Sequence, residues 1–335
     1  MSLIELSGVD KHFSVRRRRG LRWERSTVRA VDDLSFTVGE GEIVGYIGPN
    51  GAGKSTTIKM LTGILTPSGG RVRVSGLDPA RQRSTLARRV DVVFGQRTTL
   101  WWDLPLRDSF ELLRRLYRVE AAAYRSTVDR LVSLLDLGPL LDTPVRQLSL
   151  GQRMRGDLAA ALVHQPRILY LDEPTIGLDV VSKAAIRDFL AELNTDRGTT
   201  ILLTTHDLDD IERLCRRVMV IDHGMLAFDG DLDTLRGRAA AERTLVVDLA
   251  EPAPPLEIPG VRLSRVDGPR QWLAFPAADS AARVVAAVMA RHEVVDIAVR
   301  EPDIEDVVAE LYRGQPPRRS SSHRADGGQV TPPAR

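Results

Sequence analysis

The segment Gly48–Ser55, with the sequence GPNGAGKS, constrains the fold of this 335-residue chain more than any other feature. It matches the pattern G-x-x-x-x-G-K-[ST] and lies between an apolar run at 42–47 and a helix-like sequence, STTIKMLTGIL. Glycines let successive backbone N–H groups converge on phosphate oxygens, and the N-terminus of the following helix adds positive charge. The segment therefore predicts a phosphate-binding loop between a strand and a helix. Its residues are Gly48, Pro49, Asn50, Gly51, Ala52, Gly53, Lys54 and Ser55, followed by Thr56.

Lys54 is the charged residue of this loop. We expect its ammonium to reach the β- and γ-phosphates of a nucleotide, Ser55 to hold Mg²⁺ and Thr56 to contact the α-phosphate. Only four of the 47 basic residues in the chain are lysines. A chain that otherwise uses arginine thus retains a lysine where a compact ammonium is needed.

Two carboxylates, Asp172 and Glu173, follow an apolar, strand-like run at 167–171. Because ligands bind at the carboxyl edge of parallel sheets, we expect both side chains to face the phosphate loop. Asp172 can hold Mg²⁺ through water, and Glu173 can orient and polarise an attacking water. The pair therefore predicts phosphoryl transfer.

Strand-like runs alternate with helical patterns along the first two thirds of the chain, which predicts an α/β fold. Leucines at three- and four-residue spacing predict a helical insertion at about 106–150, and 180–193 is also helical. A hairpin is expected around His223-Gly224. The other expected strands are 71–74, 90–94, 167–171 and 200–203.

The pattern changes near residue 230, where short strands and helices of a second unit begin. We expect a nucleotide-binding domain over 1–235, a small α+β domain over 240–314 and a disordered tail over 315–335, which has few apolar residues to bury. In the small domain, strands are expected at 243–249, 261–266, 271–275 and 294–299, and helices at 281–291 and 303–313.

Composition excludes several classes of protein. An apolar content of 43% excludes a mostly disordered chain, and no apolar run approaches the length of a membrane-spanning helix. The start, MSLIELSGVDKHF, lacks the pattern of a secretion signal, and the single cysteine, Cys215, cannot form an internal disulfide, so we expect a cytoplasmic location. The net charge of +2 gives no global attraction to nucleic acid, so no nucleic-acid partner is expected.

Six motifs occur in order along the chain: GPNGAGKS, VFGQ ending at Gln96, LSLGQ, LDEP, GLD and TTHD. Together they resemble the ATP-binding subunit of ABC transporters, over about residues 1–235. The resemblance implies a P-loop NTPase core with an antiparallel β part and a helical insertion. It also implies ATP and Mg²⁺ as cofactors, and two ATPase subunits, in a homodimer or a heterodimer, around two ATP molecules.

LSLGQ, at residues 148–152, resembles the family's signature sequence, which lies across the dimer interface on the partner's γ-phosphate. The resemblance implies this role for Ser149, Gly151 and Gln152. Leu150 departs from the usual glycine, which affects the expected geometry of that interface. Asp179 resembles the loop residue that communicates across the dimer.

His206 resembles the histidine that contacts the γ-phosphate, and it joins Glu173 and Lys54 as an implied catalytic residue. Gln96 resembles the glutamine that binds Mg²⁺ and ATP and links the nucleotide state to the membrane partner. An aromatic ring near the N-terminus stacks on adenine in the family. Phe13 matches that position by context, although an apparent insertion at 14–27 follows it and Trp23 competes for the role.

Two further segments indicate contacts outside the chain. Trp101 and Trp102 follow Gln96 in RTTLWWDLP, and they either pack the helical insertion onto the sheet or form a docking patch for a membrane subunit. The arginines of 16–19 form either a solvated loop or a contact with anionic lipid headgroups.

These observations predict an ATPase, peripheral on the inner face of the cell membrane, that drives separate permease subunits. Within the family, the chain resembles the branch that serves ABC-2 type exporters, which includes drug and antibiotic efflux systems. The resemblance lies in the LSLGQ–LDEPTIGLD combination, the segment RTTLWWDLP and the segment EPDIEDVVAELY. The alternatives are an importer ATPase with a C-terminal regulatory domain, and a non-transport ABC ATPase acting on DNA or the ribosome. A P-loop kinase or GTPase does not explain LSLGQ or His206.

Overall fold

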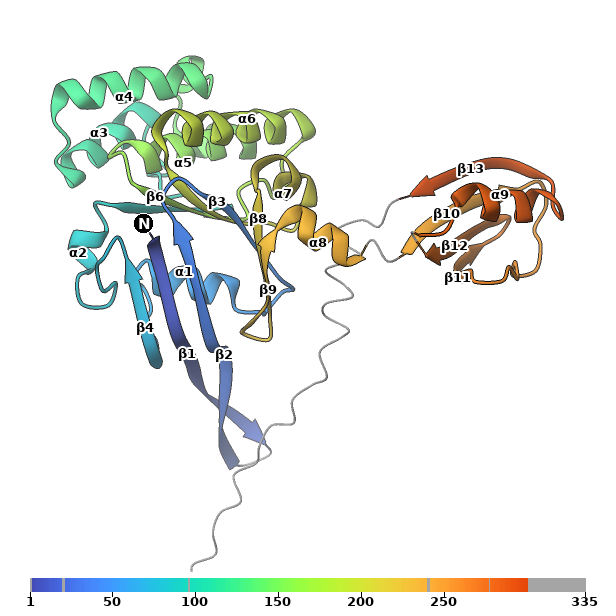
Figure 1. Ribbon diagram of the computed structural model, residues 1–335. Coiled ribbons are helices and arrows are strands. Elements are labelled where there is room, and N and C mark those ends of the chain that lie inside the picture. The colour runs from blue at the N-terminus through green and yellow to red at the C-terminus, as the bar shows by residue number, and fades with distance from the viewer. Residues whose placement is uncertain (1, 20–21, 96, 240–241, 277, 301–335) are drawn as a thin grey trace, which may run out of the picture.

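A six-stranded sheet forms the centre of the N-terminal part (Figure 1). The computed structural model describes residues 2–19, 22–95, 97–239, 242–276 and 278–300. The strand order is β5-β6-β7-β3-β8-β9, in which the first five strands are parallel and β9 is antiparallel to β8. This arrangement confirms the predicted α/β fold. The strands are β3 (Ile43–Ile47), β5 (Val90–Phe94), β6 (Ile168–Asp172), β7 (Thr200–Thr204), β8 (Arg217–Asp222) and β9 (Met225–Asp231).

A second, antiparallel sheet has the order β2-β1-β4, with β1 at Ser2–Arg19, β2 at Arg22–Gly39 and β4 at Gly69–Val74. The interpretation of 16–19 as a loop is wrong, because these residues belong to β1. The interpretation of 14–27 as an insertion stays a prediction; 14–19 and 22–27 continue β1 and β2, which pair from Phe13 opposite Val28 to Arg19 opposite Arg22. Because each strand satisfies the backbone hydrogen bonds of the other, the hairpin needs no apolar alternation to form.

The central sheet is buried on both faces, and alternate residues of one strand serve two different cores. In β6, Leu169 and Leu171 pack towards the helices, whereas Ile168 and Tyr170 pack towards the antiparallel sheet and α1. Figure 1 shows α3 to α6 on one side of the sheet and β1, β2 and β4 on the other. The remaining helices of this part are α1 (Lys54–Leu61), α2 (Arg83–Leu86), α6 (Val180–Arg197), α7 (Leu208–Leu214) and α8 (Leu232–Ala239).

The helical insertion predicted at 106–150 is present. It contains α3 (Leu106–Tyr117), α4 (Ala121–Leu134) and the 3₁₀ turns η1 (Gly138–Leu140) and η2 (Val145–Gln147), and it leads into α5 (Leu150–Leu162). Leu106, Phe110 and Leu113 of α3 are buried at the helical spacing on which the prediction rested.

The predicted hairpin joins β8 to β9. His223 and Gly224 both have positive φ angles, of 46° and 82°, as the tight turn of a two-residue hairpin requires. In the following helix α8, Leu232 and Leu235 are buried in the core of the N-terminal part. The expected boundary at 235 therefore falls inside a helix that packs on the N-terminal part.

A four-stranded antiparallel sheet follows, in the order β11-β12-β10-β13. Its strands are β10 (Glu242–Leu249), β11 (Arg262–Asp267), β12 (Arg270–Pro276) and β13 (Val294–Arg300), and its helix is α9 (Ala281–Met289). Leu245, Leu273, Phe275 and Val284 belong to a core separate from the other two. The expected helix at 303–313 and tail at 315–335 lie outside the described residues. Over the described ranges, no helix is both long and apolar enough to cross a membrane.

Candidate functional site

A cavity of about 500 Å³ opens at the carboxyl edge of the central sheet. The phosphate loop forms one side of it, and the ends of β6 and β7 form another. The residues predicted from the sequence that line it are Pro49, Asn50, Gly51, Gly53, Lys54, Ser55, Thr56, Asp172, Glu173 and His206. Four further residues that were not predicted as site residues also line it: Lys59, Phe94, Arg97 and Ile176. Phe94 and Ile176 lie inside the motifs VFGQ and LDEPTIGLD, which could have indicated them.

Two glycines of the loop occupy positions where a side chain has no room. A Cβ atom at Gly48 would lie 2.2 Å from the carbonyl oxygen of Ile221, and one at Gly53 would lie 2.5 Å from that of Ala30. Gly53 also has φ of 110°, which L-residues rarely adopt. The loop therefore lies tightly against the middle of β2 and the end of β8.

Lys54 begins α1 and is almost fully buried. Its Nζ donates hydrogen bonds to the carbonyl oxygen of Gly48, at 2.5 Å, and to that of Pro49, at 3.3 Å. Burial lowers the pKa of the ammonium from its ordinary value, while the nearby carboxylates of Glu173 and Asp172 oppose that change. The loop thus holds a positive charge where a phosphate group is expected.

Ser55 and Asp172 meet across the cavity. The Ser55 hydroxyl donates to Oδ2 of Asp172 at 3.0 Å, and the Thr204 hydroxyl donates to Oδ1 at 2.7 Å. A hydroxyl and a carboxylate are the hard oxygen donors that suit Mg²⁺, which keeps several waters in its coordination shell. The donor chemistry therefore fits the expected metal. Gln96, the third expected ligand, lies outside the described residues.

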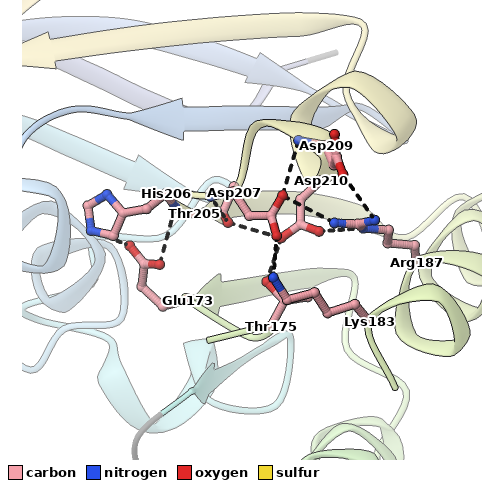
Figure 2. Close-up of polar contacts among 9 residues, drawn as sticks. All are labelled: Glu173, Thr175, Lys183, Arg187, Thr205, His206, Asp207, Asp209 and Asp210. Carbon is pink, nitrogen blue, oxygen red and sulfur yellow. Dashed lines mark hydrogen bonds and ion pairs between the residues drawn. The ribbon is translucent and has the colours of Figure 1, made fainter. Parts of the chain in front are cut away.

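Glu173 and His206 form a close pair beside the phosphate loop (Figure 2). Nε2 of His206 lies 3.0 Å from Oε1 of Glu173, and the backbone N–H of His206 donates to Oε2 at 3.2 Å. Burial raises the pKa of the Glu173 carboxyl, against the opposing charges of His206 and Lys54. Glu173 also has φ of 59°, a strained conformation for a residue with a side chain.

A cluster of polar side chains lies beside this pair (Figure 2). It comprises Thr175, Lys183, Arg187, Asp207 and Asp210, from three different segments. The sequence contained no signal for it, because DLDD after His206 is typical of a solvated helix start.

The signature residues do not line the cavity of their own chain. Ser149 is the N-cap of α5, and it exchanges hydrogen bonds with Gln152 in a capping box. A Cβ atom at Gly151 would lie 2.6 Å from Oγ of Ser182, so the start of α5 packs on the start of α6. Asp179 caps α6 and accepts hydrogen bonds from the backbone and side chain of Ser182.

Phe13 is not among the residues that line the cavity. It lies in β1 opposite Val28, and the Lys11 ammonium is 5.2 Å from the centre of its ring. Trp23 lies in β2 opposite Arg18, and its side chain is outside the described part of the structure. The adenine-stacking role of Phe13 or Trp23 therefore stays a prediction.

Comparisons with known proteins agree with this geometry. Residues 31–176 match the sequence family described as "ABC transporter". The chain is 35% identical to the daunorubicin resistance ATP-binding protein DrrA3 of Streptomyces coeruleorubidus, over 84% of this chain and 91% of the relative. It is 34% identical to the daunorubicin/doxorubicin resistance ATP-binding protein DrrA of Streptomyces peucetius, over 90% and 93%. It is 42% identical to the Nod factor export ATP-binding protein I of Paraburkholderia xenovorans, over 60% and 65%.

Solved structures show the same fold. An ATP-binding subunit of an ABC transporter superposes with a TM-score of 0.61 at 26% identity, covering 70% of this chain and 92% of that one. A dimeric ATP-binding cassette bound to ADP and Pi superposes with a TM-score of 0.57 at 26% identity, covering 68% and 98%.

Proposed function

Because this chain belongs to the family of ABC transporter ATP-binding proteins, we propose that it hydrolyses ATP to drive an ABC-2 type permease that exports a small molecule. The observation that carries the chemistry is the convergence of Lys54, Ser55, Asp172, Glu173 and His206 on one cavity. Export is supported by the relatives, since the names of several refer to drug resistance or Nod factor export.

Each residue of the cavity has a distinct role in this proposal. Lys54 and the N–H groups of its loop bind the β- and γ-phosphates. Ser55 and Asp172 would hold Mg²⁺, which would supply neutralisation of charge on the phosphate oxygens. Glu173 accepts a proton from the attacking water, and His206 holds the Glu173 carboxylate and contacts the γ-phosphate. Phosphoryl transfer depends mainly on such positioning and charge neutralisation.

A second ATPase subunit completes the site. Ser149, Gly151 and Gln152 lie away from the cavity of their own chain, so they are free to face the γ-phosphate bound to a partner. The helix N-terminus at Ser149 offers backbone N–H groups and partial positive charge to that phosphate. We therefore propose a dimer, of two identical chains or of two related ones, with two ATP molecules at the interface.

The rate of hydrolysis is expected to fall as the pH is lowered, because Glu173 acts in its ionised form. Its pKa is raised in the folded chain, so the active carboxylate is lost at a higher pH than the ordinary value near 4.5. The measurement is kcat at saturating ATP and Mg²⁺ over roughly pH 5 to 8, with the melting temperature followed in parallel. A kcat that stays constant throughout this range in the folded protein would contradict the role of Glu173.

Trp101 and Trp102 are proposed as the docking patch for the permease on the inner face of the membrane. Trp101 is 40% exposed and Trp102 is 49% exposed. Two contacts hold Trp102 on the helical insertion. The Arg153 guanidinium of α5 lies 5.5 Å from the Trp102 ring centre, and the backbone N–H of Arg146 donates to the Trp102 carbonyl oxygen. A rigid, exposed aromatic pair is typical of a protein interface.

Replacing Trp101 or Trp102 with alanine is expected to lower transport at least about tenfold while basal ATP hydrolysis is retained. Trp272→Ala is the matched control, because its ring also lies under an arginine, Arg265, at 4.7 Å, on the C-terminal sheet. Transport and ATPase activity are measured with the co-purified permease. Normal transport by both variants would exclude the docking role.

Capture of the full chain from detergent-solubilised membranes tests the transporter assignment itself. The expected companion is an integral membrane protein of the ABC-2 permease type, identified by mass spectrometry. Ribosomal proteins or DNA in its place would contradict the proposal and favour a non-transport ATPase.

A further inference from the structure

Asp210 is a fully buried carboxylate that the reaction described above does not use. Its side chain is 1% exposed, and that of its partner, Arg187, is 8% exposed. Nε of Arg187 donates to Oδ1 of Asp210 at 2.5 Å. Removing two charges from water is costly, and a buried ion pair adds little net stability compared with apolar residues. The position of the Arg187–Asp210 pair in the fold therefore indicates its role better than its contribution to stability does.

The other oxygen of Asp210 holds the two strand ends that carry the catalytic pair. Oδ2 accepts hydrogen bonds from the hydroxyls of Thr175, at 2.5 Å, and Thr205, at 3.0 Å. Thr175 is two residues beyond Glu173, and Thr205 immediately precedes His206. One carboxylate thus joins the segment after β6 to the end of β7, as Figure 2 shows.

Arg187 also fixes the helix that starts next to His206. It donates from a terminal nitrogen to Oδ1 of Asp207 at 3.2 Å, and Lys183 donates to Oδ2 of the same residue at 2.5 Å. Although burial opposes it, the hydrogen bond from Lys183 and the charges of Lys183 and Arg187 hold the pKa of Asp207 below its ordinary value. Asp207 is the N-cap of α7, so its position constrains the backbone conformation of the preceding residue, His206.

We propose that the Arg187–Asp210 ion pair is a positioning element that holds Glu173 and His206 at hydrogen-bond distance for hydrolysis. This inference rests on the proposed function. The pair touches neither the phosphate loop nor the metal ligands Ser55 and Asp172. Its loss should therefore slow the chemical step while leaving ATP binding intact, because a small displacement of a catalytic group costs rate rather than ground-state affinity.

The test compares Arg187→Met with Arg217→Met in the purified full-length protein. Arg217 is a matched control, since it also bridges two carboxylates, Asp229 and Glu42, but not at the catalytic pair. We expect Arg187→Met to lower kcat about 10- to 100-fold and to change KM and the affinity for a fluorescent ATP analogue by less than about threefold. Arg217→Met is expected to lower the melting temperature without changing kcat.

A double variant, Arg187→Met with Asp210→Asn, separates positioning from stability. It removes the uncompensated buried charge, so the melting temperature should recover. The value of kcat should stay low, because the amide oxygen of asparagine accepts from the two threonines more weakly than a carboxylate and the ion pair is still missing. If Arg187→Met does not fold, Arg187→Lys is measured instead, and an intermediate kcat is expected since an ammonium reaches only one carboxylate well.

Wild-type kcat in the double variant, in Arg187→Met or in Arg187→Lys would overturn the positioning role. That result differs from a failure of the proposed function, in which the wild-type chain itself would neither bind nor hydrolyse ATP.

Discussion

Glu173→Gln is expected to lower ATP hydrolysis by about two to three orders of magnitude and to trap an ATP-bound dimer. Glutamine nearly preserves the shape of glutamate but cannot accept a proton from water. The carboxylate lies 3.0 Å from Nε2 of His206, at the edge of the phosphate-loop cavity, where the attacking water must be oriented. Removal of the negative charge also lessens repulsion of the ATP phosphates, so binding is retained.

Two measurements on Glu173→Gln decide this prediction: phosphate release at saturating ATP, and molecular mass in solution with and without ATP. The control is Glu192→Gln, which changes a surface carboxylate of α6 that lies 3.8 Å from Arg130. This control should hydrolyse ATP at the wild-type rate. A Glu173→Gln protein that stayed monomeric and fully active would refute both the catalytic role and the dimer.

Lys54→Met is expected to weaken ATP binding by about 10- to 150-fold. A hydrogen bond from a charged donor contributes about 1.5–3 kcal/mol, which corresponds to that range. Among the described residues, this ammonium donates to the carbonyl oxygens of Gly48 and Pro49 in its own loop, and it lines the cavity where a phosphate is expected.

Lys54→Arg tests why a chain rich in arginine has a lysine here. Lys54 is 7% exposed, and its Nζ lies 2.5 Å from the Gly48 oxygen. A planar guanidinium is larger than an ammonium and cannot occupy the same position. We expect this variant to lose affinity nearly as strongly as Lys54→Met, although it keeps the charge. Affinity is measured by titration with a fluorescent ATP analogue, and the melting temperature reports folding. Wild-type affinity in Lys54→Arg would show that charge alone suffices.

The phosphate loop and the two carboxylates could be predicted because each motif consists of residues that are adjacent in the sequence. Gly48 and Gly53 are needed where the backbone passes within contact of neighbouring segments, and Lys54 follows at a fixed position. Asp172 and Glu173 end an apolar strand, and the carboxyl edge of a parallel sheet brings such ends together. The structure places Gly53, Lys54, Asp172 and Glu173 on one cavity.

The N-terminal hairpin shows where local pattern was insufficient. The interpretation of 14–27 as an insertion rests on the separation of KHF from VRAVDDLSF, and no strand is expected there. In the structure, 14–19 and 22–27 extend β1 and β2, which are stabilised by backbone pairing between the two strands. Side-chain pattern reports burial, and it carries little information about strands whose main partner is another backbone.

The sequence by itself determined which residues are proposed to bind phosphate, to hold a metal and to activate water. Only the tertiary structure decided how these groups are held. Asp210 lies in an acidic run that resembles a solvated helix start, yet the packing of α6 buries it against Arg187 and the two threonines beside the catalytic pair. The physical reason is that a motif depends on neighbours along the backbone, whereas burial and charge pairing depend on segments that meet only after folding.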